Sequence, residues 1–204
     1  MLGALLLCCA TAFAATPAQA AEYRYWSFWQ RSADGWVYAT QGPSIARPDD
    51  GDVDGFRFAV SADATTAKKP RGTADFDAIC ADTPAKGGQK RIAVVIDFGT
   101  AADAPGKQAP PKPRTACARI ADAGSSADAL AAVAKPLRYD NNALLCAISD
   151  YPESGCGEQV SGDGEESGAG DSGDGGPSVG LLAGAAAVVV LGAAAFWQAR
   201  RRRG

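Results

Sequence analysis

Histidine is absent from the 204-residue chain. The side chain that most often transfers protons near neutral pH, and that most often binds zinc, is therefore missing. Its absence excludes Ser-His-Asp triads, Cys-His pairs and histidine-zinc centres from this chain. An enzyme built from this sequence would have to work with carboxylates, lysine, tyrosine or serine alone. We therefore expect a protein that is not an enzyme and that needs no cofactor.

Clustered positive charge is also missing from the part of the chain that can fold. Residues 22–160 carry 16 basic and 18 acidic side chains, and the whole chain has a net charge of -3. The basic cluster that does occur is the run of four arginines at residues 200–203. Proteins that bind nucleic acids need grouped lysine and arginine to neutralise phosphates, so we expect no nucleic-acid partner.

An apolar run at residues 2–15 is followed by the small-residue pattern Ala-Gln-Ala that ends at Ala20. A signal peptidase reads small side chains at these positions, so we predict a signal peptide over residues 1–20. The usual positive n-region is missing, so either the true start lies upstream or the signal is atypical. Cys8 and Cys9 do not fit a lipoprotein signal, because a leucine directly precedes them, and we expect both thiols to leave with the signal peptide.

Residues 179–197 contain no charged side chain and consist mainly of Val, Leu, Ala and Gly. A helix of this length spans most of a hydrocarbon layer of about 30 Å. Phe196 and Trp197 stand where an interfacial aromatic belt is expected, and the four arginines that follow indicate a cytoplasmic side. We predict a transmembrane helix over residues 179–197 and a basic cytoplasmic tail over residues 198–204. A buried core helix would leave four arginines against an interior face, and the Leu-Pro-x-Thr-Gly motif of sortase-anchored proteins is absent.

The segment between the domain and the predicted membrane helix, residues 161–178, is almost entirely Gly, Ser, Asp and Glu. Such a composition cannot build a core, so we predict a disordered acidic linker with a root-mean-square span of roughly 25 Å. Residues 21–160 remain as one extracellular domain, which is long enough for a single modest core. The predicted protein is thus single-pass, sits in the cell membrane and has the lipid bilayer as a partner.

Two segments rich in aromatic and β-branched residues, 22–30 and 36–40, flank an Asp-Gly pair at residues 34–35. This arrangement is typical of a β-hairpin with a tight turn. Alternating apolar residues at 53–60 predict a third strand. The continuous apolar run at residues 91–98 predicts a fourth strand that is buried on both faces.

Two helices are predicted in the remainder of the domain. The first covers residues 74–80, where Asp75 is placed to cap it, and the second covers residues 126–135. The second helix begins at Ser125 or the next serine and ends before Pro136.

Further strands are expected near residues 114–120 and 142–149, and the four prolines in residues 100–113 predict an exposed loop. Strands dominate the first third of the domain and alternate with helices later. The predicted fold class is therefore α+β: a mixed β-sheet with an N-terminal aromatic hairpin and about two helices, followed by the linker and one transmembrane helix.

Four cysteines remain after the predicted signal peptide: Cys80, Cys117, Cys146 and Cys156. An even number in an oxidising compartment indicates two disulfides. Of the three possible pairings we favour Cys146 with Cys156, which closes a short loop, and Cys80 with Cys117, which ties the first helix to the far side of the proline-rich loop. Redox catalysis usually requires Cys-x-x-Cys, which is absent, so we expect structural disulfides.

Asp50, Asp52 and Asp54 stand at alternate positions and match the first half of an EF-hand calcium loop. The second half does not match, because Ser61 occupies the position of the bidentate glutamate and Arg57 stands where an apolar residue is usual. Calcium binding through the three aspartates stays an alternative. An acidic turn that leads into the third strand is the expected role, and no metal is predicted.

The hairpin carries aromatic side chains on both faces. One face must meet the core, and the other would expose flat rings suited to stacking on a sugar or an apolar partner. Trp26, Trp29 and Trp36 are the candidates for ligand stacking, and full burial of the hairpin beneath the helices is the favoured alternative. Asp97, at the end of the buried strand, is the carboxylate whose position most resembles an active site. A single aspartate is no catalytic signature, so no catalytic residue is predicted.

The aromatic run at residues 23–29, the Gly-Phe-Arg-Phe strand at residues 55–58, the four cysteines and the arginine-terminated apolar segment together carry a resemblance. The whole chain resembles a family of actinobacterial exported, single-pass membrane proteins of uncharacterised function. Members tend to be encoded near energy-coupling-factor systems for vitamin or cobalt uptake. The resemblance implies an accessory role at the cell surface and supplies no catalytic or binding residues.

Two functions follow as expectations. The first is a membrane-anchored extracytoplasmic binding or accessory protein that hands a ligand to, or docks on, a transporter or another envelope protein. The second is a cell-wall glycan-binding or adhesin-type surface protein that uses the aromatic hairpin as a stacking platform. A hydrolase that uses Asp97 with another carboxylate is a third, less favoured class.

Overall fold

The computed structural model describes residues 21–106, 108–160 and 200. The chain separates into two units, residues 1–168 and 169–204, and the first contains the folded domain. The predicted signal peptide, linker and transmembrane helix lie outside the described residues. Within the residues that are described, no helix combines the length and the hydrophobicity needed to cross a membrane.

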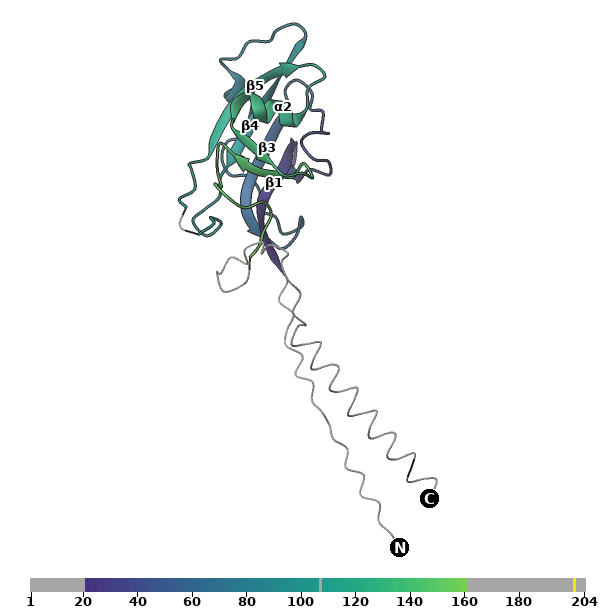
Figure 1. Ribbon diagram of the computed structural model, residues 1–204. Coiled ribbons are helices and arrows are strands. Elements are labelled where there is room, and N and C mark those ends of the chain that lie inside the picture. The colour runs from purple at the N-terminus through teal and green to yellow at the C-terminus, as the bar shows by residue number, and fades with distance from the viewer. Residues whose placement is uncertain (1–20, 107, 161–199, 201–204) are drawn as a thin grey trace. The chain divides into compact units, whose positions relative to one another are not determined.

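The domain is a mixed α+β structure that consists mostly of sheet, as predicted (Figure 1). Its elements in chain order are β1 (Glu22–Ser32), β2 (Gly35–Tyr38), β3 (Val53–Ser61), α1 (Phe76–Cys80), β4 (Gln89–Asp97), β5 (Arg114–Ala121), α2 (Ser126–Val133), β6 (Leu137–Tyr139), β7 (Leu145–Ile148) and β8 (Gln159–Val160).

Six strands form the main sheet in the order β2-β1-β3-β4-β5, and β8 pairs with β1. The pair β3 and β4 is parallel, whereas all other neighbours in this sheet are antiparallel. The predicted N-terminal hairpin is confirmed, because β1 and β2 pair antiparallel and Ser32 faces Gly35 beside the two-residue turn. Gly35 has a φ of 127°, a conformation that glycine adopts without the steric cost of a Cβ atom.

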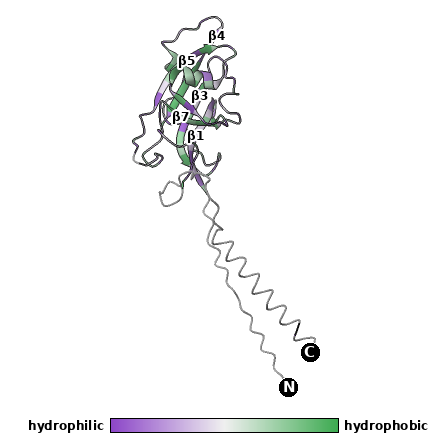
Figure 2. Cartoon of the chain, in the orientation of Figure 1, coloured by the Kyte–Doolittle hydropathy of each residue, from purple (hydrophilic) through white to green (hydrophobic). Residues whose placement is uncertain are grey.

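The strand that the sequence predicts to be buried on both faces is β4. Ile92, Val94 and Ile96 point into the larger core cluster, together with Leu130 of α2. The alternate residues of β4 point into a smaller cluster that includes residues of α1. The two helices therefore cover opposite faces of the sheet, and hydrophobic residues are concentrated in the central strands (Figure 2).

Both helices begin at the caps expected from the sequence. The side chain of Asp75 accepts a hydrogen bond from the main-chain N–H of Ala78 at 2.7 Å. Ser125 caps α2 and exchanges hydrogen bonds with Asp128, which forms a capping box. Each cap satisfies main-chain donors that a helix start leaves without an intrahelical partner.

Two short strands, β6 and β8, are not predicted from the sequence. With β7, β6 forms a separate two-stranded sheet, while β8 adds to the N-terminal end of β1. Strands of two or three residues are too short to show an alternating pattern, so neither could be recognised from periodicity.

The structure contains the disulfides that the sequence favours. Cys80 at the end of α1 is bonded to Cys117 of β5, with the Cα atoms 5.0 Å apart. Cys146 of β7 is bonded to Cys156 in the segment before β8, with the Cα atoms 4.5 Å apart. The first disulfide fixes α1 to the sheet, and the second holds the β6–β7 sheet to the returning chain.

Candidate functional site

The three tryptophans named as stacking candidates do not form one exposed platform. Trp26 and Trp29 are 5% and 3% exposed and lie on opposite faces of β1, because their side chains are three positions apart on a strand. Trp36 is half-buried, and its ring lies over Gly55 of β3. The hairpin is thus largely packed, with Trp26 lining a surface depression and Trp36 half-buried.

The edge of β1 that faces away from β3 is only partly paired. At one end the main-chain N–H of Arg24 donates to Glu158, and at the other end Ala39 donates to the carbonyl of Phe28. Main-chain groups of alternate residues in a strand point to the same edge, so the N–H and C=O of Trp26 point to this edge too. Neither has a hydrogen-bond partner among the described residues.

A groove of about 250 Å³ lies beside this unpaired stretch of β1. Its floor contains Trp26, Phe28 and Leu145, and its walls are formed by residues 38–43 and 143–144. No residue that lines the groove carries a charge. The groove therefore combines an apolar floor with walls that carry no charge.

The first wall of the groove is held rigidly by main-chain hydrogen bonds. The carbonyl of Gly42 accepts from Ile45 and Ala46 at 3.0 Å, and the carbonyl of Pro43 accepts from Ala127 of α2 at 2.8 Å. A wall fixed in this way needs little ordering when a ligand binds, which lowers the entropic cost of binding.

The second wall is the turn between β6 and β7. The side chain of Asp140 accepts hydrogen bonds from the N–H groups of Asn142 and Leu144, both at 2.8 Å. Ala143 between them has a φ of 61°, which is uncommon for a residue other than glycine. The hydrogen bonds of Asp140 hold this turn in place and present Leu144 at the rim.

Exposed apolar side chains lie in or next to the two turns that bound the groove. Leu144 belongs to the second wall, Ile45 follows the first wall in the same turn, and Tyr139 directly precedes the second turn. These are three of the five large hydrophobic residues that are exposed in the described part of the domain. Exposed apolar groups that cluster around a depression are typical of an interaction surface.

A buried ion network closes the end of the sheet where β4 stops. The carboxylate of Asp97 receives a bidentate contact from Arg71 at 2.7 and 2.8 Å and is also paired with Arg57. Asp103 accepts hydrogen bonds from Lys68 at 2.7 Å and from Arg57 at 3.1 Å. The network fixes the segment that carries Lys68 and Arg71 to the sheet.

The electrostatics of this network argue against acid–base chemistry at Asp97. Burial alone would raise its pKa, but hydrogen bonds from Arg71, Arg57 and the Gly99 N–H hold the pKa below its ordinary value. In the same way, Lys68 and Thr100 offset burial and lower the pKa of Asp103 to about 2. Both carboxylates are ionised near neutral pH, and their oxygen atoms are occupied by protein donors.

The three aspartates of the calcium alternative are not brought together. Asp50 is paired with Arg91 at 2.9 Å, and Asp52 accepts from the main chain of Asp49 at 2.8 Å. Asp54 is 1% exposed and points into the core beneath α2. No group of three acidic, cysteine or histidine side chains in the described ranges is arranged to hold a metal ion. The segment is an acidic turn that enters β3, which is the role the sequence favours.

Asp54 is an unusual core residue, because neither carboxylate oxygen accepts a hydrogen bond from a described residue. Burial raises its pKa to about 6, and the nearby Ser126 hydroxyl and Lys90 offset this effect only in part. Lys90 itself donates to the carbonyl of Pro48 at 2.6 Å. Asp54 therefore influences stability rather than forming an accessible site.

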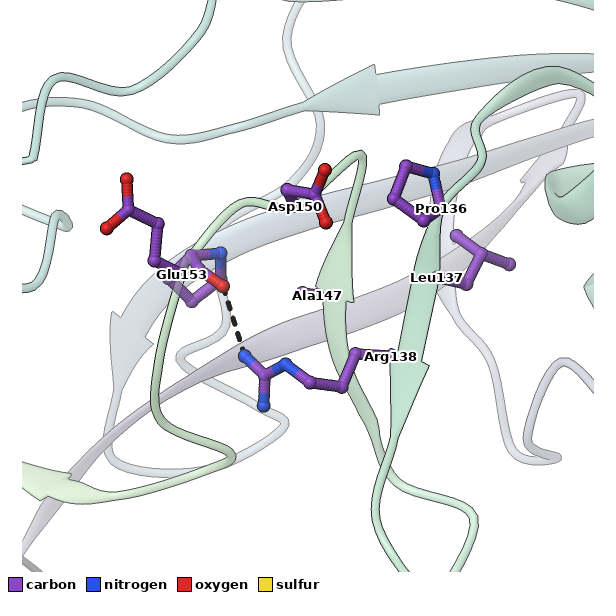
Figure 3. Close-up of a pocket in the computed structure, with 7 residues that line it drawn as sticks. Pro136, Leu137, Arg138, Ala147, Asp150 and Glu153 are labelled. Carbon is purple, nitrogen blue, oxygen red and sulfur yellow. Dashed lines mark hydrogen bonds between the residues drawn. The ribbon is translucent and has the colours of Figure 1, made fainter.

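A second depression, of about 340 Å³, lies beside β6 (Figure 3). Arg138 lines it but donates to the carbonyls of Pro152 and Gly155 at 3.0 and 2.9 Å. Asp150 and Glu153 contribute exposed carboxylates at the rim, as Figure 3 shows. This depression offers acceptors for a cationic group, but no buried unpaired side chain points into it, so we assign no site there.

A half-exposed group of tyrosines lies on the other face of the hairpin. Tyr23 is 41% exposed, and Tyr25 follows it on the same face of β1. Burial and the adjacent Tyr38 raise the pKa of Tyr25 to about 12. Tyr38 contacts the ring of Trp29 edge-on, with the centroids 5.1 Å apart. Tyr23 supplies an exposed ring of the hairpin, while Tyr25, Tyr38 and Trp36 are each half-buried.

The groove residues outside β1 were missed by the sequence prediction. Thr40, Pro43 and Leu144 lie in turns, where neither periodicity nor a motif singles them out. The acidic and amide residues at 140–142 do signal a turn, but nothing in the sequence indicates that this turn meets residues 38–43.

The fold and its candidate site define a disulfide-linked α+β domain that carries a small uncharged groove at an incompletely paired strand edge. The chain belongs to the SCO2322-like domain family, whose pattern matches residues 18–161. This membership agrees with the resemblance of the sequence to an uncharacterised actinobacterial family. Neither a curated protein nor a solved structure matches the chain.

Proposed function

We propose that this protein is a non-enzymatic binding module, held outside the cytoplasm by a membrane anchor, whose domain docks on another envelope protein. The observation that carries the proposal is the rigid, uncharged groove with exposed Leu144 at its rim. The partner that the resemblance favours is a component of a vitamin or cobalt uptake system. The groove is small beside the roughly 300–1,000 Å³ of sites that enclose whole small molecules, which favours an accessory role over a carrier role.

The location outside the cytoplasm is part of this proposal. Two disulfides support it, because disulfides persist in oxidising compartments and are rare in the cytosol. The apolar segment at residues 179–197 with the arginines at residues 200–203 supports a single membrane span with the tail inside. Protease added to intact cells should digest the domain and leave the tail protected. Digestion of the tail alone would show that the chain has the opposite orientation in the membrane.

The absence of enzymatic activity is also proposed, and the ion network supports it. A general acid or base needs a carboxylate that can exchange a proton near the working pH. The pKa values of Asp97 and Asp103 are lowered, so neither carboxylate exchanges a proton near neutral pH. Their hydrogen bonds to arginine and lysine are those of a structural cluster.

Site-specific photo-crosslinking in intact membranes tests the docking function. A photoreactive amino acid would replace Leu144 at the groove rim in one full-length variant and Thr73, an exposed residue outside the groove, in a second. We expect a membrane-protein adduct from position 144 that is absent from position 73. Identical adducts at both positions, or no protein adduct at position 144, would overturn the proposal.

A second candidate function is binding of cell-wall glycan, and the half-exposed tyrosines favour it. Tyr23, Tyr25 and Tyr38 offer aromatic rings with polar hydroxyls, which suit stacking on sugars. Retention of the full-length chain on purified cell wall, lost in a Tyr23→Ala/Tyr25→Ala variant that leaves the groove lining unchanged, would support this function. Retention on the wall without any protein adduct from position 144 would favour glycan binding over protein docking.

A further inference from the structure

β5 forms the edge of the main sheet opposite to β2, and no strand of the described residues pairs with its outer side. Thr115 and Arg119 of this strand are exposed, and Cys117 between them is half-buried. Two strands, β3 and β4, separate β5 from β1 and the groove beside it. What binds at this edge is therefore independent of the docking proposed above.

The main-chain groups of β5 that point outward follow from the hydrogen bonds of β4. The N–H of Ala93 in β4 donates to the carbonyl of Asp52 at 3.0 Å, on the side of β3. Because these groups alternate in direction along a strand, the neighbouring Ile92 points its N–H and C=O toward β5, where it pairs with Ala118. The odd-numbered residues of β5, at positions 115, 117 and 119, consequently point their N–H and C=O groups away from the sheet.

These three N–H and three C=O groups have no hydrogen-bond partner in the part of the chain that the structure describes. The edge closes only at the end of β5, where the C=O of Ala121 accepts from Gly124 at 2.8 Å. A row of unpaired donors and acceptors on an exposed strand is a template for another strand. Addition of a strand to such an edge is a recurrent mode of peptide recognition.

The charge of the edge restricts which strand can pair with it. Arg119 donates to the carbonyl of Pro84 at 2.7 Å and has no carboxylate partner among the described residues. Its cross-strand neighbour in β4, Arg91, is paired with Asp50 at 2.9 Å. Opposite charges on directly paired residues are stabilising, whereas like charges are destabilising. A strand added outside β5 would therefore be stabilised by a carboxylate opposite Arg119.

We propose that the outer edge of β5 binds an extended segment of a separate polypeptide, which pairs with residues 115–119 and places a carboxylate opposite Arg119. The pairing is antiparallel, which is the more stable arrangement per residue. The residue of the segment opposite Cys117 donates its N–H to the carbonyl of that cysteine and accepts from its N–H.

Two other occupants fit this edge less well. A second copy of the chain would bring another Arg114 and Arg119 but no carboxylate, since residues 114–121 contain none. The linker at residues 161–178 has five carboxylates, but it also has seven glycines and no β-branched or aromatic residue. Such a composition is unfavourable for a strand. The segment that fits the edge therefore belongs to another protein.

Fluorescence anisotropy with the full-length chain in detergent micelles tests the proposal. The probe is fluorescein-Thr-Glu-Val-Thr-Val-Thr-Thr-amide, whose central threonine would pair with Cys117 and whose glutamate would lie opposite Arg119. Three matched peptides contain lysine in place of the glutamate, N-methyl-threonine at the centre, or N-methyl-valine directly after the centre. We expect binding about tenfold weaker, a difference of ~1.4 kcal/mol, for the first two peptides. The third should bind like the probe, because the N–H that it lacks would point away from β5.

Two substitutions in β5 locate the bound peptide. Thr115→Pro removes an N–H that points outward, a position where an edge strand tolerates proline, and Thr115→Ala is the control that keeps this N–H. We expect the first variant to bind the probe about tenfold more weakly and the second to bind it like the parent chain. Arg119→Glu should also weaken binding of the probe about tenfold, and it should bind the lysine peptide more tightly than the parent chain does.

The outcomes decide whether the edge binds a strand and which strand it is. Equal binding of the two N-methylated peptides, or no saturable binding of the probe, would overturn the proposal. If Thr115→Pro fails to fold in a urea-unfolding control, the charge exchange between Arg119→Glu and the lysine peptide still decides, and its absence would overturn the assignment of the carboxylate.

Two further results would identify a different occupant. If replacement of the five linker carboxylates by asparagine and glutamine strengthened binding of the probe about tenfold, the linker would occupy the edge. If the chain self-associated in sedimentation experiments and the probe abolished this association, a second copy would occupy it. In either case the assignment to a separate polypeptide would be wrong.

Discussion

Arg57 and Asp97 are direct neighbours across the parallel strands β3 and β4, and their side chains form an ion pair in which neither residue is more than 2% exposed. Asp103, which lies in the loop after β4, also forms an ion pair with the guanidinium of Arg57. Charges removed from water in this way are stable only while each keeps its partners. The pair therefore links the register of the two central strands to the loop that follows them.

Asp97→Asn should destabilise the domain strongly. The substitution keeps the shape of the side chain but leaves the buried Arg57 without its main counter-charge, and loss of one partner of a buried pair costs about 3–5 kcal/mol. Urea unfolding of the full-length chain in detergent micelles, followed by tryptophan fluorescence, measures the effect. Asp122→Asn, at an exposed carboxylate, is the control and should change stability by less than about 0.5 kcal/mol. Equal effects of the two variants would show that the ion network does not contribute to stability.

The stability of the domain should reach its maximum at mildly acidic pH. The pKa values of Asp97 and Asp103 are lowered on folding, so their contribution is present above about pH 4 and is lost as the pH falls towards 2. The pKa of Asp54 is raised from 3.8 to about 6, so the folded state binds its proton more tightly. This contribution is present below about pH 4 and is lost as the pH rises through 6, at a cost of about 3 kcal/mol.

Asp54→Asn separates the two effects, because asparagine has a similar shape and stays uncharged. The variant should be more stable than the parent at pH 7.5 by about 3 kcal/mol, with little difference at pH 4. Urea unfolding of both chains at several pH values between 3 and 8 gives the comparison. If the free energy of unfolding of both chains fell equally between pH 4 and 7, Asp54 would not be the source of the loss of stability.

Much of the fold was predictable, because the signals that determine it are local. The Asp34–Gly35 turn, the apolar run of β4 and the serine cap of α2 each act within a few residues, and the structure contains all three elements. The cysteine pairing was also predicted, from the short loop that Cys146 and Cys156 close and from the tie that Cys80 and Cys117 make between the first helix and the far side of the proline-rich loop. The sheet order and the separate β6–β7 sheet could not be predicted, since they depend on contacts between segments distant in sequence.

The candidate site was much less predictable than the fold. Aromatic content directed attention to Trp26, Trp29 and Trp36, but the alternation of β1 buries Trp29 on one face and most of Trp26 on the other. The groove arises where β2 and β8 leave part of one strand edge uncovered. No pattern in a single sequence reports how far two short strands extend along a third.

The two disulfides should contribute unequally to stability. Cys80 and Cys117 are 37 residues apart, whereas Cys146 and Cys156 are 10 residues apart. In the chain-entropy description, a cross-link that closes a longer loop restricts the unfolded chain more, which gives about 4 and about 3 kcal/mol for these separations. Cys80→Ser/Cys117→Ser should thus lower the free energy of unfolding more than Cys146→Ser/Cys156→Ser. The reverse order in urea unfolding would show that native contacts outweigh loop closure.

Gly55 lies against two side-chain rings on the α1 face of the sheet, and a methyl group there should be costly. A Cβ atom at this position would lie 2.7 Å from the Trp36 ring and 2.9 Å from Cγ of Pro70. Both neighbours are rigid rings, so neither can move aside by rotating a flexible end. Overpacking of this kind costs about 1–3 kcal/mol, and Gly55→Ala should lower the free energy of unfolding by that amount.

Gly87→Ala is the matched control for this substitution, since a Cβ atom at Gly87 would meet no atom within 4 Å and its φ is not in the left-handed region. We expect the control to unfold at nearly the urea concentration of the parent chain. A second variant, Gly55→Ala combined with Trp36→Leu, removes the ring that the methyl group would strike. It should be less destabilised than the sum of its single changes, because residues in contact do not contribute additively. Additive effects would show that Trp36 does not pack on Gly55.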